Sequence, residues 1–289
     1  MIEMKEISLS DLNKYSPWPN RLRGIEEFAI REKTDAEVRR EFEAEKWNEL
    51  LQECKNSDKL TVDIVEGLFS DLSLEMPYYE DGKFYIDTYG NILKRHLDLY
   101  SNTLAPHIDG ASALVELGAG FGSKILHLSN REAFKDLPLV AGEYAGTGRD
   151  IMKLLNESSD RKMKIGHCDF RSLEIDEGLV PENAIIFTSY AANYVPQLDN
   201  AFADYLLALN PEVIVHFEPV YEVLELNTEF DKMCQKYMEL NDYNKNLLQV
   251  IKESEAQGKS KISSLRPNCL SANPFLPISV LEWHPQREG

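Results

Sequence analysis

Residues 113–123 of this chain, Ala-Leu-Val-Glu-Leu-Gly-Ala-Gly-Phe-Gly-Ser, decide its fold. A short apolar run leads into three glycines at positions 118, 120 and 122, and residues 124–128 after them have the apolar spacing of a helix. The pattern predicts a β-strand, a tight turn and the start of an α-helix. Glycines in such a turn allow positive φ and a close approach of ligand to backbone, while the helix N-terminus favours an anionic group. The stretch therefore predicts a site for a nucleotide-like ligand.

The spacing of the glycines distinguishes two kinds of nucleotide site. The dinucleotide fingerprint Gly-x-Gly-x-x-Gly needs a glycine at position 123, where the chain has Ser123. Instead Glu116 precedes the turn in the order Glu-x-Gly-x-Gly-x-Gly, which resembles the first motif of class I S-adenosylmethionine-dependent methyltransferases. The resemblance implies that Glu116 faces the ammonium of the cofactor, directly or through water. It places the turn under the amino-acid part of the cofactor: Gly118, Ala119, Gly120 and Gly122. A glycine-rich connection without a ligand is the alternative.

Composition sets the class of protein. The chain has 289 residues, of which 43% are hydrophobic and 28% charged, so it can bury a substantial core. Its apolar runs are shorter than the roughly 18 residues that span a bilayer, and residues 1–7 lack the basic and then apolar order of a signal peptide. Four widely spaced cysteines form no Cys-x-x-Cys pair, which favours reduced thiols over disulfides or a zinc site. We expect a cytoplasmic globular protein without a metal.

The net charge of −18 limits the partners. The summed field of such a chain repels phosphates, and the sequence offers no cluster of lysines and arginines against it. Nucleic acid and anionic membranes are therefore disfavoured. Small molecules, peptides or a basic partner protein are the favoured substrates.

Residues 1 to about 105 favour helices and carry none of the nucleotide features. Residues 34–37, Thr-Asp-Ala-Glu, have the form of a capping box, and the apolar stripe that follows through Trp47 to Cys54 is interpreted as a packing face. Residues 77–89 surround an Asp-Gly turn signal with aromatic side chains and predict either a surface hairpin or a lid over a cleft. We expect a helical or lid region over 1–105 and a cofactor-binding domain over 106–289.

From about residue 111, predicted strands and helices alternate, which indicates an α/β fold with a doubly wound, mostly parallel sheet. The second strand ends at Glu143, 23 residues after Gly120, and a carboxylate there can accept hydrogen bonds from both hydroxyls of a ribose. Tyr144 then packs on the sugar or caps the sheet. The family resemblance implies that Asp169, after the third strand, accepts a hydrogen bond from the adenine amino group and that Phe170 lies against the ring.

The fourth and fifth strands, 184–190 and 213–217, supply the candidate chemistry. Ligands lie beyond the carboxyl ends of parallel strands, so we expect Ser189 and Tyr190 near the sulfonium and the acceptor. Methyl transfer to a hydroxyl or protonated amine needs alignment and a base, and His216 and Glu218 are the candidate bases. The alternative for His216 is burial within the apolar strand.

Residues 261–265 and 277–283 predict an antiparallel final pair of strands, which completes a seven-stranded, Rossmann-like methyltransferase sheet. The resemblance covers roughly residues 105–289, and residues 188–194, 217–222 and 241–244 look like a subgroup labelled sugar O-methyltransferase. We therefore expect an enzyme that uses S-adenosylmethionine to methylate oxygen or nitrogen of a small molecule, a sugar-like metabolite or a peptide side chain. A nicotinamide oxidoreductase, a cofactor-binding protein without turnover and a nucleic-acid methyltransferase are the alternatives.

Overall fold

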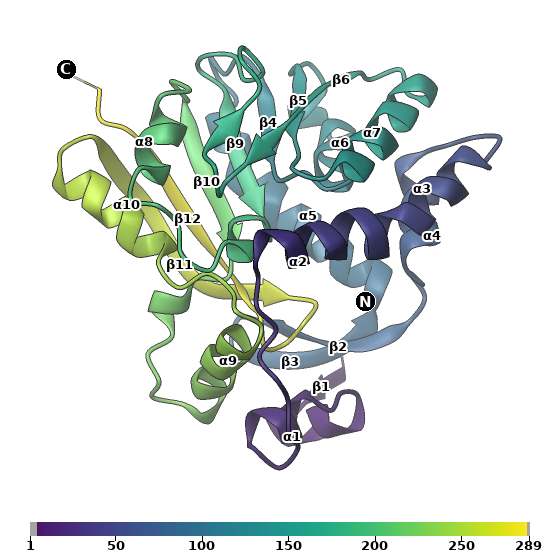
Figure 1. Ribbon diagram of the computed structural model, residues 1–289, viewed down its shortest axis with the longest axis vertical. Helices are drawn as coiled ribbons and strands as arrows, with labels where there is room; N and C mark the ends of the chain where they lie inside the picture. The colour runs from purple at the N-terminus through teal and green to yellow at the C-terminus, as the bar shows by residue number, and fades with distance from the viewer. Residues whose placement is uncertain (1–4, 288–289) are drawn as a thin grey trace.

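The computed structural model describes residues 5–287 and arranges them around one large mixed sheet (Figure 1). The expectation about a signal peptide concerns residues 1–7, of which 1–4 lie outside the described residues, as do residues 288–289. Ten described strands lie side by side in this order: β1 (Lys5–Ile7), β3 (Lys83–Thr88), β2 (Glu75–Glu80), β11 (Ser260–Ser271), β12 (Ile278–Pro285), β10 (Val213–Glu218), β9 (Ile185–Ser189), β4 (Leu114–Leu117), β5 (Leu139–Gly142) and β6 (Met163–Gly166).

Seven of these strands form the predicted methyltransferase-like sheet. The strands β6, β5, β4, β9 and β10 are all parallel, as expected for strands joined through helices. The chain then returns through β11 and β12, and β12 pairs antiparallel with both β10 and β11. The α/β fold class and the antiparallel final pair are confirmed.

The sheet is larger than predicted, because the N-terminal region adds strands to it. The aromatic segment forms the hairpin β2–β3, and its two-residue turn places Asp81 at φ 44° and Gly82 at φ 88°, as a tight hairpin requires. Strand β2 pairs with β11, and β1 pairs with β3 on the outside. The N-terminal region therefore contains strands as well as the expected helices, and the hairpin alternative for residues 77–89 is confirmed. The hairpin covers the backbone groups at the C-terminal end of β11, where Leu270 and Ser271 pair with β2.

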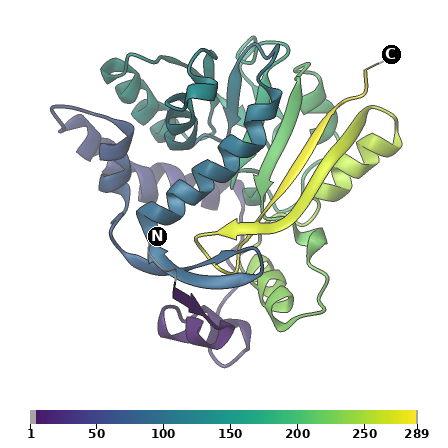
Figure 2. The same ribbon diagram turned by 180° about the vertical axis from the view of Figure 1, so that it is seen from behind.

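Helices cover both faces of the sheet, which makes the fold doubly wound. Apolar side chains of α3 to α7 pack on one face, and those of α8 and α10 pack on the other. Figure 2 shows the long helix α5, drawn in blue, lying along the first of these faces. The helices are α1 (Trp18–Leu22), α2 (Asp35–Arg39), α3 (Trp47–Lys55), α4 (Val62–Phe69), α5 (Tyr89–Leu104), α6 (Ser123–Ser129), α7 (Gly146–Ser158), α8 (Phe202–Leu207), α9 (Glu229–Leu240) and α10 (Leu247–Ala256). Within residues 5–287 no helix is long and apolar enough to cross a membrane.

The first long helical run begins where the capping box predicted. The Thr34 side chain accepts a hydrogen bond from the backbone N–H of Glu37, which satisfies a free donor at the start of α2. A π-helical segment, η2 (Arg40–Lys46), then joins α2 to α3. Such segments are rare and often occur at functional sites, because they change which side chains face a neighbour.

Strand β10 lies inside the sheet and is buried on both faces. Its side chains alternate between the two hydrophobic cores, so Val215 and Phe217 pack toward α5 while Ile214 packs toward α8 and α10. All six residues of the strand are buried. Strand β10 is the predicted fifth strand, and burial on both faces explains why its sequence is mostly apolar.

Truncation of Ile214 tests this account of the core. We expect Ile214→Ala to lower the free energy of unfolding by about 2–5 kcal/mol, because a fully buried side chain leaves a cavity between β10 and the helices. Urea unfolding followed by circular dichroism measures the change. The control is Leu74→Ala, whose side chain is 56% exposed and whose loss should change stability by less than about 0.5 kcal/mol. Equal effects of the two substitutions would contradict the two-sided core.

Candidate active site

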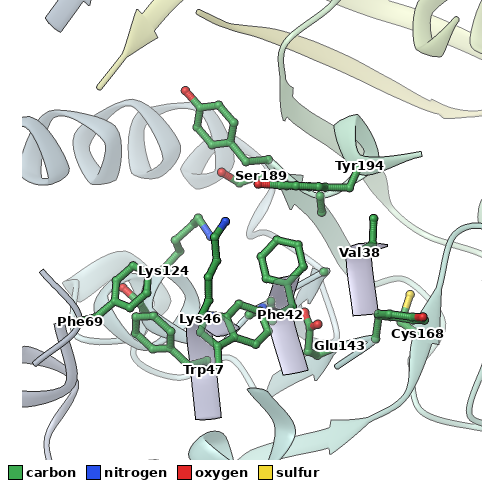
Figure 3. Close-up of a pocket in the computed structure, with 18 of the residues that line it drawn as sticks. Val38, Phe42, Lys46, Trp47, Phe69, Lys124, Glu143, Cys168, Ser189 and Tyr194 are labelled. Atoms are coloured by element: carbon green, nitrogen blue, oxygen red, sulfur yellow. Dashed lines mark hydrogen bonds between the residues drawn. The ribbon is translucent and has the colours of Figure 1, made fainter. Parts of the chain in front are cut away.

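A cavity of about 450 Å³ lies at the carboxyl ends of β4, β5 and β9 (Figure 3). The glycine turn and the residues after β5 and β9 form its floor, and side chains from the N-terminal region close it. Figure 3 shows Phe42 and Trp47 on the side of the cavity that faces Ser189 and Tyr194. Its position agrees with the rule that ligands of parallel sheets bind beyond the carboxyl ends of the strands.

The glycine turn has the backbone geometry that its sequence predicted. Gly118, Gly120 and Gly122 have φ values of 75°, 62° and 81°, which side chains other than glycine rarely adopt. A Cβ atom on Gly118 would lie 2.2 Å from the Cβ of Ala191, so the close packing of this turn on the end of β9 requires glycine. Gly118, Ala119 and Gly120 line the cavity, whereas Gly122 is the N-cap of α6.

Glu143 follows β5 directly and lines the cavity next to the turn. Its carboxylate accepts hydrogen bonds from the backbone N–H of Gly120 at 2.7 Å and of Ala145 at 2.8 Å. The side chain is nearly buried, and this burial raises the pKa of the carboxyl to about 7, although the two N–H donors oppose the shift. Glu143, the acid predicted at the end of the second strand, therefore lies where the glycine turn meets the end of β5.

The next acidic position also reaches the cavity. Asp169 ends the short strand β7 (Cys168–Asp169), and its carboxylate accepts hydrogen bonds from the Arg171 backbone at 2.8 Å and the Ser172 hydroxyl at 3.0 Å. Phe170 beside it is buried and packs edge-on against Phe202 at 5.5 Å. Both residues line the same cavity as Glu143, so three segments distant in sequence meet there.

Tyr144 also lines the cavity, with its hydroxyl turned to the N-terminal region. The hydroxyl donates a hydrogen bond to Asp35 at 2.6 Å, and the Arg39 guanidinium lies 4.9 Å from the ring centroid. These contacts join the end of β5 to α2, the helix that leads into the cover of the cavity.

Ser189 and Tyr190 line the cavity from the end of β9, as expected. The Ser189 hydroxyl shares a hydrogen bond of 2.9 Å with the hydroxyl of Tyr100. Tyr190 has φ 52°, and its hydroxyl donates toward Ser271 Oγ at 3.3 Å and the carbonyl of Leu276 at 3.2 Å. Since both hydroxyls already have partners, they shape the wall of the cavity.

Glu116 has a different position from the one that the resemblance implied. It is fully buried in β4 and is not among the residues that line the cavity. Its carboxylate accepts hydrogen bonds from Lys124 Nζ at 3.3 Å and the backbone N–H of Ile125 at 3.2 Å. Burial raises its pKa despite these donors. Glu116 thus fixes the start of α6 behind the turn, and Lys124 reaches the cavity in its place.

His216 lies in the second hydrophobic core and not at the cavity. The side chain is fully buried, stacks near Trp283 at a centroid distance of 6.1 Å and contacts Thr188 through a hydrogen bond of 2.9 Å. Burial lowers its pKa to about 3, so the ring is neutral at pH 7. The expectation that His216 is a base is wrong, because the alternation along β10 turns it away from the cavity.

Glu218 is at the end of β10, as predicted, but backbone N–H groups and the Thr188 side chain already donate to its carboxylate. It accepts hydrogen bonds from the N–H groups of Ala191, Ala192 and Asn193 at 2.9–3.3 Å. The side chain is fully buried and does not line the cavity. The expected role of Glu218 as a base is wrong, since its geometry is that of a cap on the turn after β9.

Sequence reasoning missed the side chains that close the cavity. Val38, Phe42 and Trp47 line it, so the stripe that was interpreted as a packing face serves both a core and a cavity. From residues 77–89 the cavity is lined by Tyr89 alone, so the hairpin is not its cover. The remaining contributions from the N-terminal region are Lys46, Glu66, Phe69, Ser70 and Leu93. The sequence gives no clear signal for the π-helical segment η2. The apolar stripe did give a signal for the side chains that close the cavity.

Cations and carboxylates in the wall are already paired. Lys46 Nζ donates to Glu41 at 2.5 Å, and Arg171 donates to the carbonyl of Tyr194 at 2.7 Å. Aromatic and aliphatic side chains make up most of the remaining surface. The cavity therefore suits a ligand with a large apolar part and a few oriented polar groups.

One group of side chains brings possible metal ligands together. Ligand atoms of Asp63, Glu66 and His127 lie within 4.8 Å of one another. The Glu66 carboxylate is already shared by His127 Nε2, at 2.9 Å, and the hydroxyl of Ser123, and Asp63 is exposed. These contacts account for the group as an internal polar contact between α4 and α6.

The chain is similar to known proteins in its fold and not in its sequence. No family model and no curated sequence matches it. Among solved structures, magnesium protoporphyrin IX methyltransferase from Synechocystis PCC 6803, with bound S-adenosylhomocysteine (SAH), is 10% identical, covers 86% of this chain and 99% of its own, and gives a TM-score of 0.52. An O-methyltransferase from Bacillus cereus in complex with SAH is 12% identical, covers 82% of this chain and 91% of its own, and gives 0.43. The first of these two structures shows that the fold is the Rossmann-like methyltransferase fold, as the glycine motif predicted.

Removal of the Glu218 carboxylate tests its structural role. We expect Glu218→Ala to lower the free energy of unfolding by about 1–3 kcal/mol, because buried N–H donors lose their acceptor. Thermal and urea unfolding measure the loss. Glu225→Ala, at an exposed position nearby, is the control and should change stability by less than about 0.5 kcal/mol. Unchanged stability in Glu218→Ala would return this carboxylate to the list of candidate bases.

Proposed function

We propose that the protein is an S-adenosylmethionine-dependent methyltransferase. The observation that carries the proposal is the meeting of three parts at one cavity: the glycine turn, Glu143 and Asp169. The spacing of these parts along the chain matches the order in which a nucleoside is held across the ends of three adjacent strands. The bound cofactor supplies a methyl group on a positive sulfur, so the protein needs chiefly to align it with an acceptor.

The residues of the cavity divide into roles. Glu143 accepts hydrogen bonds from the ribose hydroxyls, Asp169 accepts one from the adenine amino group, and Phe170 packs on the ring. The turn at Gly118, Ala119 and Gly120 lies under the amino-acid part. Gly122 and Glu116 support that turn from behind, and Tyr144, Ser189 and Tyr190 complete the walls. The support for these roles is the position of each group around the cavity and the residues to which it is bonded.

The division of the chain near residue 105 has a functional meaning in this proposal. Residues 106–289 hold the cofactor, and residues 1–105 cover it and shape the space for the acceptor. The cavity of about 450 Å³ is within the range of small-molecule sites, and it must hold both ligands. We propose a small molecule, a sugar-like metabolite or a peptide side chain as acceptor, methylated at oxygen or nitrogen. The net charge of −18 disfavours nucleic acid.

A cytoplasmic location belongs to the same proposal. All four cysteines, Cys54, Cys168, Cys234 and Cys269, are free and buried. Reduced thiols of this kind are typical of a reducing compartment.

A comparison of ligands separates methyl transfer from the nicotinamide alternative. We expect saturating SAH to raise the melting temperature, since a ligand at 100 times its Kd adds about 2.7 kcal/mol to stability, and NADH to leave it unchanged. Gly120→Val should abolish the SAH shift, because its side chain enters the cavity beside Trp47. Gly178→Val is the matched control: Gly178 also has positive φ, at 66°, but has open space around it. A shift with NADH and none with SAH would overturn the proposed cofactor.

The pKa of Glu143 gives the proposal a pH dependence. Ribose hydroxyls donate to an ionised carboxylate, and burial raises the pKa of Glu143 to about 7 in the free protein. Below that pH the carboxyl is protonated, so SAH affinity should fall by about tenfold for each further pH unit. Glu143→Gln should bind more weakly at pH 8 and show no such fall. Calorimetry from pH 5.5 to 8 measures the SAH affinity of both proteins. Glu143→Gln also controls for any titration of SAH itself.

A pH-independent affinity in the unsubstituted protein, or full affinity in Glu143→Gln, would remove Glu143 from the ribose site. Transfer of a labelled methyl group to acceptors in a lysate separates an enzyme from a cofactor-binding protein without turnover.

A further inference from the structure

Two lysine side chains line the cavity from different parts of the chain. Lys46 ends the π-helical segment η2 in the N-terminal region, and Lys124 follows the glycine turn in α6. Both side chains line the cavity and are partly open to solvent, at 40% and 29% exposed. Figure 3 shows their ammonium groups on one side of the cavity, between Ser189 and Trp47 and away from Cys168. A ligand in the cavity therefore meets both lysines.

The π-helical register gives Lys46 its position. Its ammonium donates a hydrogen bond to Glu41, five residues earlier in the chain. In an α-helix residues three and four apart are neighbours, whereas the i→i+5 bonding of a π-helix brings residues five apart onto one face. The rings of Phe42 and Tyr194, which line the cavity, have centroids 4.6 and 5.9 Å from the same ammonium. The segment thus holds a positive charge against two aromatic rings of the wall.

The carboxylate that Lys46 binds is shared with a second lysine. Lys33 Nζ also donates to Glu41, at 2.6 Å, and the Lys33 side chain is buried. Burial opposes ionisation of Glu41, but the two ammonium groups outweigh it and lower the pKa of this carboxyl. Glu41 is therefore ionised at pH 7 and provides one negative charge for two positive ones. Within residues 5–287, one positive charge beside the cavity is left without an ion-pair partner.

Both ammonium groups at the cavity also keep donors free, although each has a carboxylate partner. A lysine ammonium carries three N–H donors. Lys46 uses one of them on Glu41, and Lys124 uses one on Glu116 at 3.3 Å. Over the described part of the chain these are the hydrogen bonds that the two ammonium groups make, so each retains two donors for a ligand.

The acidic side chains of the wall do not take up these donors. Glu66 already accepts from Ser123 and lies 2.9 Å from His127 Nε2. Glu143 and Asp169 accept hydrogen bonds from the backbone of their own loops. The net charge of −18 gives an anion no long-range attraction, so selection of an anion must come from contacts inside the cavity, where charges are screened less than in water.

We propose that the methyl acceptor is a small molecule with a carboxylate group, which Lys46 and Lys124 bind between them. This inference rests on the proposed function and names the class of its substrate. A carboxylate has two acceptor oxygens and one negative charge, which match the free donors and the unpaired positive charge. The rest of the acceptor is apolar, because Phe42, Trp47 and Phe69 line the same cavity.

The cofactor also carries a carboxylate, in the amino-acid part that the proposed function places over the glycine turn. Lys124 lies directly after that turn, whereas Lys46 comes from residues 1–105, which shape the space for the acceptor. Two nucleosides separate these sources of a carboxylate. SAH contains the amino-acid part of the cofactor, and 5′-methylthioadenosine lacks it.

Benzoate and benzamide test the proposal in the SAH-bound protein. The two probes share a ring and nearly the same shape, and they differ in charge. We expect benzoate to bind about tenfold more tightly than benzamide, because hydrogen bonds between charged groups are stronger than those to a neutral amide. Calorimetry at low ionic strength measures both affinities, and added salt should reduce the difference.

Substitution of Lys46 assigns the preference to this site. Lys46→Met removes the charge from a partly exposed side chain, so the protein should fold and still bind SAH, and the preference for benzoate should fall to about threefold or less. Lys153→Met on α7 is the matched control. Its ammonium also pairs with a carboxylate, that of Asp150, but it does not line the cavity, so the preference should stay at about tenfold.

Each outcome has one interpretation. If SAH fails to bind the unsubstituted protein, the proposed function fails. If benzoate is preferred with 5′-methylthioadenosine but not with SAH, the lysines bind the carboxylate of the cofactor and the inference about the acceptor is wrong. It is also wrong if benzoate is no better than benzamide with SAH, or if the preference survives in Lys46→Met. If Lys46→Met does not fold, the preference of the SAH-bound unsubstituted protein and its decrease with salt decide alone.

Discussion

The site depends on hydrogen bonds from the glycine turn to the end of β5. The backbone N–H groups of Gly118 and Ala119 both donate to the carbonyl of Gly142, at 2.8 and 3.1 Å, and the N–H of Gly120 donates to the Glu143 side chain. Three successive amides therefore point in one direction, which positive φ values at the glycines make possible. The same turn lies against Ala191 after β9, so three strand ends are held at fixed distances around the cavity.

Three glutamates at or near strand ends show how the same side chain serves different purposes. Glu116, Glu143 and Glu218 are all buried, accept backbone N–H groups and have pKa values raised by burial. Glu116 secures α6 and Glu218 caps the turn after β9, while Glu143 alone of the three also lines the cavity. The difference lies in which way each carboxylate points relative to the floor of the cavity.

The N-terminal region contributes more than a cover. Its hairpin extends the sheet beyond β11, its π-helical turn brings Phe42 and Lys46 to the cavity, and α5 adds Tyr89 and Leu93 to the wall. Residues 1–105 and 106–289 share one hydrophobic core, whose members include Trp47 from the first part and Val280 from the second. An acceptor that enters the cavity therefore meets side chains from both parts.

The sequence by itself determined the alternation of strands and helices, the glycine turn and the residues that follow each strand, because these depend on local periodicity and backbone conformation. Gly118, Glu143, Asp169 and Ser189 could be assigned to the cavity for that reason. Only the tertiary structure decided that His216 and Glu218 turn away from it and that the hairpin joins the sheet. Each of these depends on contacts between residues far apart along the chain, and burial and hydrogen-bond partners exist only after those residues have met.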